Sequence, residues 1–468
     1  MADYIYKRIT DPVHGTIGLS KVEAEIISTP VFQRLRNIKQ LGLANLVFPG
    51  ADYSRFSHSI GVCHVTGRIL ENLERNKCEI GKKEIQQYRL AGLLHDIGHY
   101  PFSHAMEHAI SNFFAKDFLK TGKTVKHYNH GGVGKLILET NKDIRRILKA
   151  ANIKPDEIYK IFNREEPPRF ANLVSSDMDA DRIDYMMRTA HHTGLPYGLV
   201  DLNYLLSQLR VDKESRLCLT PKALRTAEHF LLGRYFDYQQ VAFHKTVVSM
   251  EWLLNDLIMV LLERKKIRCS AKDIENAIED GTWNTFDDTK IMEEIRGIAE
   301  GRNSGAKDKA LAIVNRRTPK LLCSVEYFDV HDEKTRKIYR NEMQSVKEKV
   351  GSWSKRFGIP LGYWHLWEPK FMTLTKSGSL VPISTSADSL KKNDLGKTRD
   401  GYEEAVRIMV DGNSSVSIME QDSSLIRALS NSALYSFRLY VLSPADKKMR
   451  IDEIRKKIKT DLPNLRWK

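Results

Sequence analysis

Cysteine is scarce in this sequence, and its few cysteines form no binding or cross-linking pattern. The 468 residues include five cysteines, and no two of them form a C-x-x-C pair. Structural zinc sites commonly use such pairs, and a disulfide framework needs closely spaced cysteines. We therefore expect neither, and interpret the five as reduced, mostly buried small hydrophobic residues.

Long hydrophobic runs are also absent. No window offers about 18 uninterrupted apolar residues, the length that crosses a membrane. The segment Met1–Arg8 lacks the apolar stretch and small-residue cleavage site of a secretory signal. The hydrophobic fraction of 41% and the charged fraction of 28% are typical of globular proteins. We therefore expect a cytoplasmic protein with no membrane partner.

Positive charge is abundant. The chain has 74 Lys and Arg against 59 Asp and Glu, a formal net charge of +15. A positive field raises the local concentration of phosphorylated ligands. The charge alone does not distinguish nucleotides from nucleic acid, and a basic but simply solvated surface would give the same count.

The length of the chain predicts two domains, because single hydrophobic cores stop growing near about 250–300 residues. From about residue 55 to 265, apolar residues recur at the three- and four-residue spacing of packed helices. The longest predicted helix begins near Pro221 and continues to about Leu262. Just before it, residues 209–211 and 216–219 predict a small hairpin.

The amino-acid pattern changes towards the C-terminus. Charged helices are predicted up to about Arg316, and shorter segments follow whose composition favours strands. The last 26 residues hold nine Lys or Arg against four acidic residues, which predicts a solvent-exposed helix with a basic face. We therefore predict a mainly α protein, with a helical domain over 1–318 and a smaller α+β region with a basic tail over 319–468. The predicted strands are 323–330, 371–374, 379–383 and 434–442, and 384–402 is predicted to be a mobile loop.

Polar side chains gather unusually in one apolar stretch. Residues 93–104 hold three histidines and an aspartate, including the adjacent pair His95-Asp96. Burying an imidazole or a carboxylate is costly unless it is paired, hydrogen-bonded or bound to metal. Adjacent helical residues diverge by about 100°, so other segments must complete any shared metal site. His58 lies upstream as one candidate.

An aspartate from downstream would complete the set. The segment 176–185 contains four, and their spacing does not choose among them: Asp177, Asp179, Asp181 and Asp184. Two imidazoles with two carboxylates form a mixed nitrogen and oxygen site, which suits iron, manganese, zinc or nickel. We therefore expect a divalent transition metal as the cofactor.

Several ordered blocks of the sequence match a known family. Over roughly residues 8–260 the chain resembles the HD-domain phosphohydrolases, and is most similar to the dNTP triphosphohydrolases, which include bacterial dGTPase-like enzymes and an animal enzyme that joins a sterile-alpha motif to an HD domain. The resemblance implies an HD-domain helical bundle. The matching blocks are 11–15, 29–36, 39–41, 47–50, 55–58, the block around His95, 181–185 and 191–194.

The resemblance also assigns roles. It selects Asp181 from the four aspartates, because this residue heads the Asp-Arg-x-x-Tyr match. By resemblance the metal ligands are His58, His95, Asp96 and Asp181. It places a catalytic group for proton transfer and phosphate contact at His99, His104, Glu107 and His130. It places substrate-binding residues at Gln40, Leu41, Arg55, Arg182, Tyr185 and Arg234. Magnesium or manganese is expected with the nucleotide.

The sequence departs from the family at three positions. Thr189 stands where relatives carry an Asp that accepts from a sugar hydroxyl, and Ala242 stands where they carry a Tyr that packs on the sugar. Losing a hydrogen-bonding partner relaxes or redirects selection. Ser28 replaces an acidic residue that reads guanine at a regulatory site, so specific activation by GTP is not expected.

The resemblance leaves other histidines without a catalytic role. His191 and His192 are interpreted as structural, and His127 and His244 are given no function. The expected partners are a nucleotide substrate, a nucleotide activator and further copies of the chain in a dimer or tetramer.

The expected activity is hydrolysis of a dNTP to deoxynucleoside and triphosphate. The alternative is an HD phosphodiesterase or nuclease acting on nucleic acid, motivated by the basic charge and the altered sugar pocket. A third hypothesis is that the protein is not an enzyme, binds nucleic acid or another partner through its C-terminal region, and uses the metal only for structure. The complete set of metal ligands argues against this hypothesis.

Overall fold

A computed structural model describes residues 5–163, 169–170, 173–174, 176–302, 304–369, 405–444 and 449–467. The predicted strands at 371–374 and 379–383 and the predicted loop at 384–402 lie outside these residues. Among the described residues no helix combines the length and the apolar composition needed to cross a membrane.

The mainly α class is confirmed. Short 3₁₀ turns are labelled η, and η7 is a π turn. The elements up to the hairpin are β1 (Lys7–Asp11), β2 (Gly15–Leu19), α1 (Lys21–Ile27), α2 (Pro30–Gln33), η2 (Arg34–Asn37), η3 (Gly42–Leu46), α3 (Arg55–Arg75), α4 (Lys82–Leu94), α5 (His104–Thr121), α6 (His130–Thr140), α7 (Lys142–Ala150), α8 (Pro155–Asn163), α9 (Ala180–Thr193), η5 (Pro196–Gly198), α10 (Leu202–Ser207), β3 (Leu209–Val211) and β4 (Leu217–Leu219).

The second half mixes long helices with the strands of two sheets. Its elements are η6 (Pro221–Ala223), α11 (Leu224–Asp237), η7 (Tyr238–Ala242), α12 (Lys245–Glu263), α13 (Ala271–Asp280), η8 (Thr282–Thr285), α14 (Asp288–Glu300), α15 (Gly305–Val314), β5 (Lys320–Val330), α16 (Glu333–Phe357), η9 (Leu361–Tyr363), β6 (Trp364–Trp367), β7 (Arg407–Met409), β8 (Ser415–Ser417), η11 (Ile418–Glu420), α18 (Leu425–Leu429), β9 (Ser432–Val441) and α19 (Ile451–Asp461).

Helix α3 lies at the centre of the helical part, packed against both α4 and α9. Its residues Val62, Cys63 and Val65 are fully buried, and they belong to a hydrophobic cluster that extends from Ile17 to Leu465. Burial of this apolar surface is the main favourable contribution to folding. The packing brings together the end of α4, the start of α9 and one face of α3, which are the segments that carry the polar motifs.

The predicted helix from Pro221 to Leu262 is wrong as one continuous element. The chain turns through the π turn η7, where the backbone N–H of Phe243 donates to the carbonyl of Tyr238 at 2.7 Å. His244 then leaves the helical conformation and caps α12, accepting from the N–H of Thr246 at 3.3 Å. A side-chain cap of this kind satisfies an N–H that lacks a helical partner. Local spacing alone does not reveal such a break.

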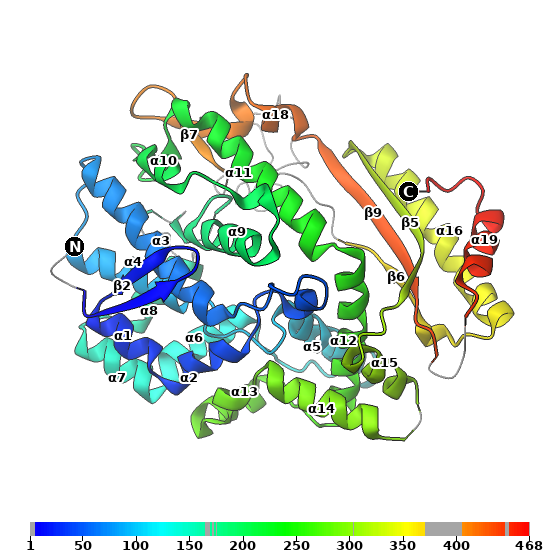
Figure 1. Cartoon of the computed structure of the whole chain (residues 1–468). Coiled ribbons are helices and arrows are strands. Elements are labelled where there is room, and N and C mark those ends of the chain that lie inside the picture. Colours follow the sequence, from blue (N-terminus) through cyan, green and yellow to red (C-terminus); the bar gives the residue numbers. More distant parts are fainter. Residues whose placement is uncertain are drawn as a thin grey trace.

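The C-terminal part contains a three-stranded antiparallel sheet in the order β5-β9-β6 (Figure 1). The predicted strands at 323–330 and 434–442 are confirmed within β5 and β9, and the predicted hairpin is confirmed as β3 and β4. Helix α16, 25 residues long, was not predicted. Its largely polar sequence buries few residues, among them Tyr339 and Trp353, so it offered little apolar pattern.

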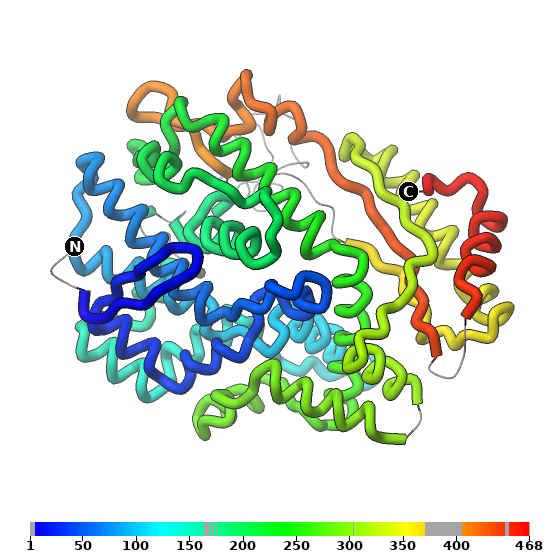
Figure 2. Tube along the Cα trace, viewed as in Figure 1, coloured from blue at the N-terminus to red at the C-terminus, as the bar shows by residue number. Residues whose placement is uncertain are grey.

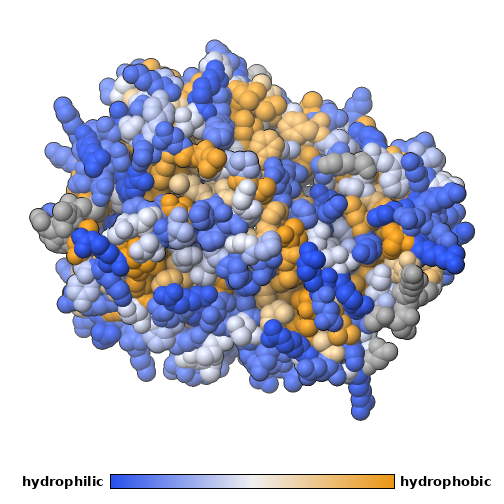
Figure 3. Space-filling view, in the orientation of Figure 1, coloured by the Kyte–Doolittle hydropathy of each residue, from blue (hydrophilic) through white to orange (hydrophobic). Residues whose placement is uncertain are grey.

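The basic helix predicted at the C-terminus is present as α19, although it is not exposed on all sides. Ile454 and Ile458 are buried, and the helix packs against β5. The N-terminal hairpin β1–β2 was also missed. In Figure 2 this hairpin and α19 lie at opposite ends of the molecule. Hydrophilic residues dominate the face shown in Figure 3, with hydrophobic residues in patches between them.

Four of the five cysteines are buried and Cys78 is partly buried, and all five are free thiols. The expectation that the cysteines are mostly buried is therefore confirmed.

Candidate metal centre

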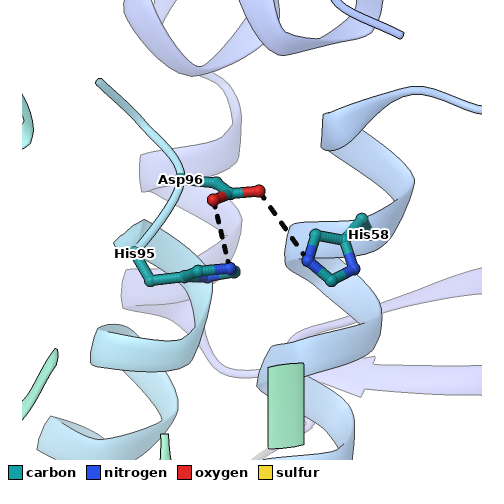
Figure 4. A group of neighbouring side chains, drawn as sticks. All are labelled: His58, His95 and Asp96. Carbon is teal, nitrogen blue, oxygen red and sulfur yellow. Dashed lines mark ion pairs between the residues drawn. The ribbon is translucent and has the colours of Figure 1, made fainter. Parts of the chain in front are cut away.

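Three predicted ligands lie together where α3 faces the end of α4. His58 comes from α3, and His95 and Asp96 follow the last residue of α4 (Figure 4). The Nε2 atom of His95 lies 3.3 Å from one carboxylate oxygen of Asp96, and the Nε2 atom of His58 lies 3.7 Å from the other. His58 is fully buried and Asp96 is 5% exposed. These three residues can hold a metal ion.

Asp181, near the start of α9, reaches the same group. Its Oδ1 atom lies 3.0 Å from Nε2 of His58 and 3.8 Å from Nε2 of His95. Donor atoms that share one metal at about 2.0–2.2 Å stand roughly 3–3.5 Å apart. The separations of 3.0–3.8 Å therefore fit a common ion.

Two buried atoms support this fit. Nε2 of His58 and Nε2 of His95 are buried, and neither has a hydrogen-bond partner of acceptable geometry among the described residues. An unsatisfied buried polar atom costs about 1–3 kcal/mol. Both nitrogens face carboxylates, and a cation between them would use the nitrogen lone pairs and the negative charge together. The residues present thus suit a divalent metal with nitrogen and oxygen ligands.

The pKa values reflect the concentration of acidic groups. Burial lowers the pKa of His58, but the carboxylates of Asp181 and Asp184 outweigh it and raise the pKa to about 9. Burial opposes ionisation of Asp96, yet the guanidinium of Arg55 and the neighbouring imidazoles hold its pKa well below its usual range. Asp96 is therefore ionised at neutral pH.

Asp184 holds His58 from its other side. The Nδ1 atom of His58 lies 2.7 Å from Asp184, and Nε2 of His14 lies 2.6 Å from the same carboxylate. The guanidinium of Arg188 donates to both oxygens of Asp184, at 3.0 and 2.9 Å, and to Asp11 at 2.8 Å. A carboxylate on Nδ1 directs the Nε2 lone pair outward, which is how metal-binding histidines are commonly oriented.

Gly61 makes this contact sterically possible. A Cβ atom at this position would lie 1.8 Å from an oxygen of Asp184 and 2.5 Å from a nitrogen of Arg188. Any other residue would displace the side chains of Asp184 and Arg188 from these positions. The glycine three residues after His58 therefore belongs to the support of the site.

The four aspartates of segment 176–185 have separate places. Asp179 caps α9, accepting from the N–H of Arg182 at 2.7 Å. Asp177 accepts from the guanidinium of Arg234 at 2.9 Å, and a second guanidinium, that of Arg182, lies 3.4 Å away. Asp184 contacts His58 from behind, and only Asp181 faces the two unpartnered imidazole nitrogens. The tertiary structure therefore separates residues that their spacing left equivalent.

A second cluster joins two histidines through one carboxylate. Glu107 lies 3.0 Å from Nδ1 of His104 and 2.8 Å from Nδ1 of His130. Burial raises the pKa of Glu107, but the contacts with the two imidazoles outweigh it and lower that pKa overall. His104 is largely exposed and His130 partly so, so both rings can meet a molecule from solution.

His99 connects the two clusters. Its Nε2 atom lies 3.0 Å from Asp96, and its ring stacks on that of His130 with centroids 4.2 Å apart. Burial, followed by repulsion from Arg55, holds the pKa of His99 well below its usual range, so the ring is neutral at neutral pH. The predicted catalytic residues are therefore contiguous with the predicted metal ligands.

The comparisons with known proteins agree with this geometry. A family model described as the HD domain matches residues 55–186. Residues 55–186 are an HD domain. The match begins with α3, includes the His95-Asp96 pair and ends within α9, so it covers all four predicted metal ligands.

Relatives of the HD domain extend the similarity along the chain. An uncharacterised protein of Methanocaldococcus jannaschii is 30% identical over 328 residues, which cover 69% of this chain and 61% of the relative. The deoxynucleoside triphosphate triphosphohydrolase SAMHD1 homolog of Dictyostelium discoideum is 30% identical over 257 residues, 53% of this chain and 48% of the relative. The chain therefore spans about half to three fifths of the length of these two relatives. It resembles dNTP triphosphohydrolases.

A solved structure shows the same fold over nearly the whole chain. A phosphohydrolase from Bacteroides thetaiotaomicron superposes with a TM-score of 0.68 at 24% identity, covering 93% of this chain and 100% of that one. At this identity the match concerns the fold.

The predicted substrate-binding residues Arg55, Arg182, Tyr185 and Arg234 lie in two groups. Arg182 and Arg234 come from α9 and α11 and converge on Asp177, so two guanidiniums stand side by side. Tyr185 is one turn from Arg182 on α9 and is partly buried. Arg55, by contrast, is 4% exposed and contacts Asp96 and, at 2.8 Å, the hydroxyl of Ser103. Its guanidinium faces the metal ligands.

One predicted substrate-binding residue, Leu41, packs against a small separate cluster of apolar side chains. The cluster includes Ala190 and Val241, the immediate neighbours of Thr189 and Ala242. The hydroxyl of Thr189 is 2.8 Å from the phenol of Tyr53. Another unsatisfied buried atom is Oε1 of Gln40.

Tyr53 contacts both Thr189 and one of the histidines interpreted as structural. Its ring stacks on that of His192, with centroids 4.9 Å apart. The hydroxyl of Thr189 therefore already has a hydrogen-bond partner within the protein.

Sequence reasoning missed the residues that support the site. Asp11, His14, Asp184 and Arg188 form the buried network behind His58, and Asp177 holds the two arginines together. One signal was available: Asp184 and Arg188 are four residues apart, a spacing that pairs charges on one helix face. The contacts to Asp11 and His14 span at least 170 residues and have no local signature.

Proposed function

We propose that this protein hydrolyses deoxynucleoside triphosphates to deoxynucleoside and inorganic triphosphate in a metal-dependent reaction. The observation that carries the proposal is the pair of unpartnered imidazole nitrogens, from His58 and His95, facing the carboxylates of Asp96 and Asp181. The similarity to dNTP triphosphohydrolases supports the substrate class. The histidine pair on Glu107 and the arginine pair on Asp177 supply the other groups that such a reaction needs.

His58, His95, Asp96 and Asp181 would hold the metal, which we propose to be iron, manganese, zinc or nickel, with magnesium or manganese accompanying the nucleotide. When bound, a metal of this kind supplies a Lewis acid for a phosphate oxygen and for water. The buried Asp184 keeps the Nε2 atom of His58 pointing to the same place throughout, which avoids reorganisation during the reaction.

The remaining groups serve binding and proton transfer. The guanidiniums of Arg182 and Arg234 neutralise charge on the triphosphate chain of the substrate. Water adds to the α-phosphorus, the bond to the 5′ oxygen breaks, and that oxygen takes a proton to become the sugar hydroxyl. His104 or His130 would donate this proton, with Glu107 fixing its tautomer. Imidazole suits the task because it titrates near physiological pH.

Product analysis tests the proposal. Purified protein would be incubated with Mn²⁺ or Mg²⁺ and each dNTP and NTP, singly and mixed, and the products separated by ion-pair chromatography. Release of deoxynucleoside and triphosphate supports the proposal. Shortened strands from DNA or RNA, without turnover of any nucleotide, would instead favour the alternative of a phosphodiesterase or nuclease.

Ala242→Tyr tests the sugar pocket. A tyrosine ring at this partly buried position, next to Val241 and Leu41, would occupy space beside the sugar and discourage a 2′-hydroxyl. We expect the ratio of kcat/KM for dNTP over NTP to rise about 10-fold or more, because a well-placed contact contributes about 1–3 kcal/mol to discrimination. Ala242→Leu adds bulk of another shape and is the control. An unchanged ratio would show that Ala242 does not line the sugar pocket.

The division at residue 318, the dimer or tetramer and the nucleotide activator stay predictions. By the family resemblance, the activator site that includes Ser28 would also include Gln33 and Arg36. Gln33 accepts from Arg36 at 2.7 Å, and the Arg36 guanidinium lies over the ring of Phe56, 3.6 Å from its centroid. An activator would have to bind these groups in place of their present contacts.

A further inference from the structure

Helix α7 separates its apolar and basic residues completely. Ile144, Ile147 and Leu148 are buried in the core. The opposite face carries four cations at the i, i+3, i+4, i+7 spacing of one helix face: Lys142, Arg145, Arg146 and Lys149. The polar face of this helix is therefore positive along its whole length.

These cations border a hollow on the surface. The hollow has a volume of about 850 Å³, and its lining includes the four α7 cations and Lys154 from the turn that follows. The other lining residues are uncharged. Five positive groups thus face one concavity whose lining contains no carboxylate.

The charge of this face is largely unneutralised, in contrast to that of helix α14. On α14, Lys290 contacts Glu293 at 3.0 Å and Glu294 at 3.1 Å. On α7 only Arg146 has such a partner among the described residues, Asp143 at 3.5 Å. Within the described parts of the chain, the side chains of Lys142, Arg145 and Lys149 make no hydrogen bond or ion pair.

An acid beside the hollow, Glu157, is already engaged. Glu157 accepts from the side chain of Gln87 at 2.9 Å and from the backbone N–H of Lys154 at 3.1 Å. Its other carboxylate oxygen lies 3.6 Å from Lys83. The hollow therefore keeps a surplus of positive charge that an anionic ligand can neutralise.

We propose that this hollow binds the sugar-phosphate backbone of duplex nucleic acid without reading its sequence. From Lys142 to Lys149 the helix rises about 10 Å. A duplex carries one phosphate charge for about every 1.7 Å of its axis with both strands counted, so the cationic face spans about six of them. No aromatic residue lines the hollow. Proteins that hold single strands commonly stack bases on aromatic rings, so the lining favours a duplex.

Salt dependence of binding measures the number of phosphates contacted. Fluorescence anisotropy with a labelled DNA duplex of about 20 base pairs, in EDTA, gives the Kd between about 50 and 200 mM salt. Five contacts predict a logarithmic slope of about −4.5, which is a loss of about 500-fold over that range. The variant K142Q/K149Q/K154Q should have a slope of about −1.8, a loss of about 12-fold, and should bind at least about 10-fold more weakly at the lowest salt concentration.

Two control variants distinguish binding at this hollow from nonspecific attraction by the net positive charge of the protein. The variant K334Q/K337Q/K347Q removes the same charge from exposed lysines of α16 and should bind like the unaltered protein. The variant K142R/K149R/K154R keeps the charge in the hollow and should also retain binding. A circular dichroism melt checks that each variant is folded.

The proposal would be overturned if the salt slope were unchanged in K142Q/K149Q/K154Q, or if the α16 variant lost as much affinity for the duplex. Tighter binding of a single strand than of the duplex, or binding of inorganic triphosphate alone, would also overturn it. The assay needs neither the metal nor turnover, so its outcome is independent of the proposed hydrolysis.

Discussion

Asp181→Ala should lower the rate of nucleotide hydrolysis by about 10³-fold or more and reduce the metal content of the purified protein. Asp181 Oδ1 is 3.0 Å from His58 and 3.8 Å from His95, so its loss removes an oxygen donor and a negative charge from the centre. A catalytic metal contributes several kcal/mol to the transition state, and each ~1.36 kcal/mol changes the rate tenfold. Steady-state kinetics and elemental analysis by mass spectrometry measure the two effects.

The control for this variant is Asp452→Ala. Asp452 is 96% exposed on α19 and pairs with Arg455, far from the metal ligands in sequence and on a different helix, so neither rate nor metal content should change. The double variant His95→Ala with Asp96→Ala should behave like Asp181→Ala. If a variant lacking these ligands were fully active and metal-free, the assignment of the centre would be refuted.

Arg188→Met should destabilise the protein by about 3–5 kcal/mol, because removing one partner of a buried ion pair leaves the other charge without compensation. Arg188 is fully buried, and its guanidinium donates to Asp184 and Asp11 at 2.8–3.0 Å. Methionine preserves much of the side-chain length, so the loss reports mainly on the charge. Urea unfolding followed by circular dichroism measures the change in the free energy of unfolding.

Arg450→Met provides the comparison. This arginine is 81% exposed and pairs with Glu453 at 2.9 Å. Solvent screens exposed pairs, so this substitution should leave the free energy of unfolding nearly unchanged. Equal destabilisation of the two variants would show that the network behind His58 adds nothing to stability. A smaller metal affinity in Arg188→Met is also expected, because Asp184 would no longer be held against His58.

The sequence alone predicted the residue types of the metal centre and much of the helical structure around it. The adjacent His95-Asp96 pair in an apolar segment required a partner, and the helical spacing over residues 55–265 predicted the helices that surround it. Side-chain chemistry and local periodicity depend on neighbours a few residues away, so they can be inferred from sequence. The same applies to the absence of disulfide and zinc patterns and to the strands β5 and β9, whose composition favours extended chain.

Only the tertiary structure decided how those residues are used. The spacing of the four aspartates in segment 176–185 does not distinguish them, but the fold gives each a different contact. Asp177 contacts Arg182 and Arg234, and Asp179 caps α9. Asp181 faces the Nε2 atoms of His58 and His95, and Asp184 contacts Nδ1 of His58. The fold also broke the helix after Pro221 at His244 and allowed α16 to form with few buried residues. These outcomes depend on contacts between segments far apart in the chain, as between His14 and Asp184, and such contacts leave no local pattern in the sequence.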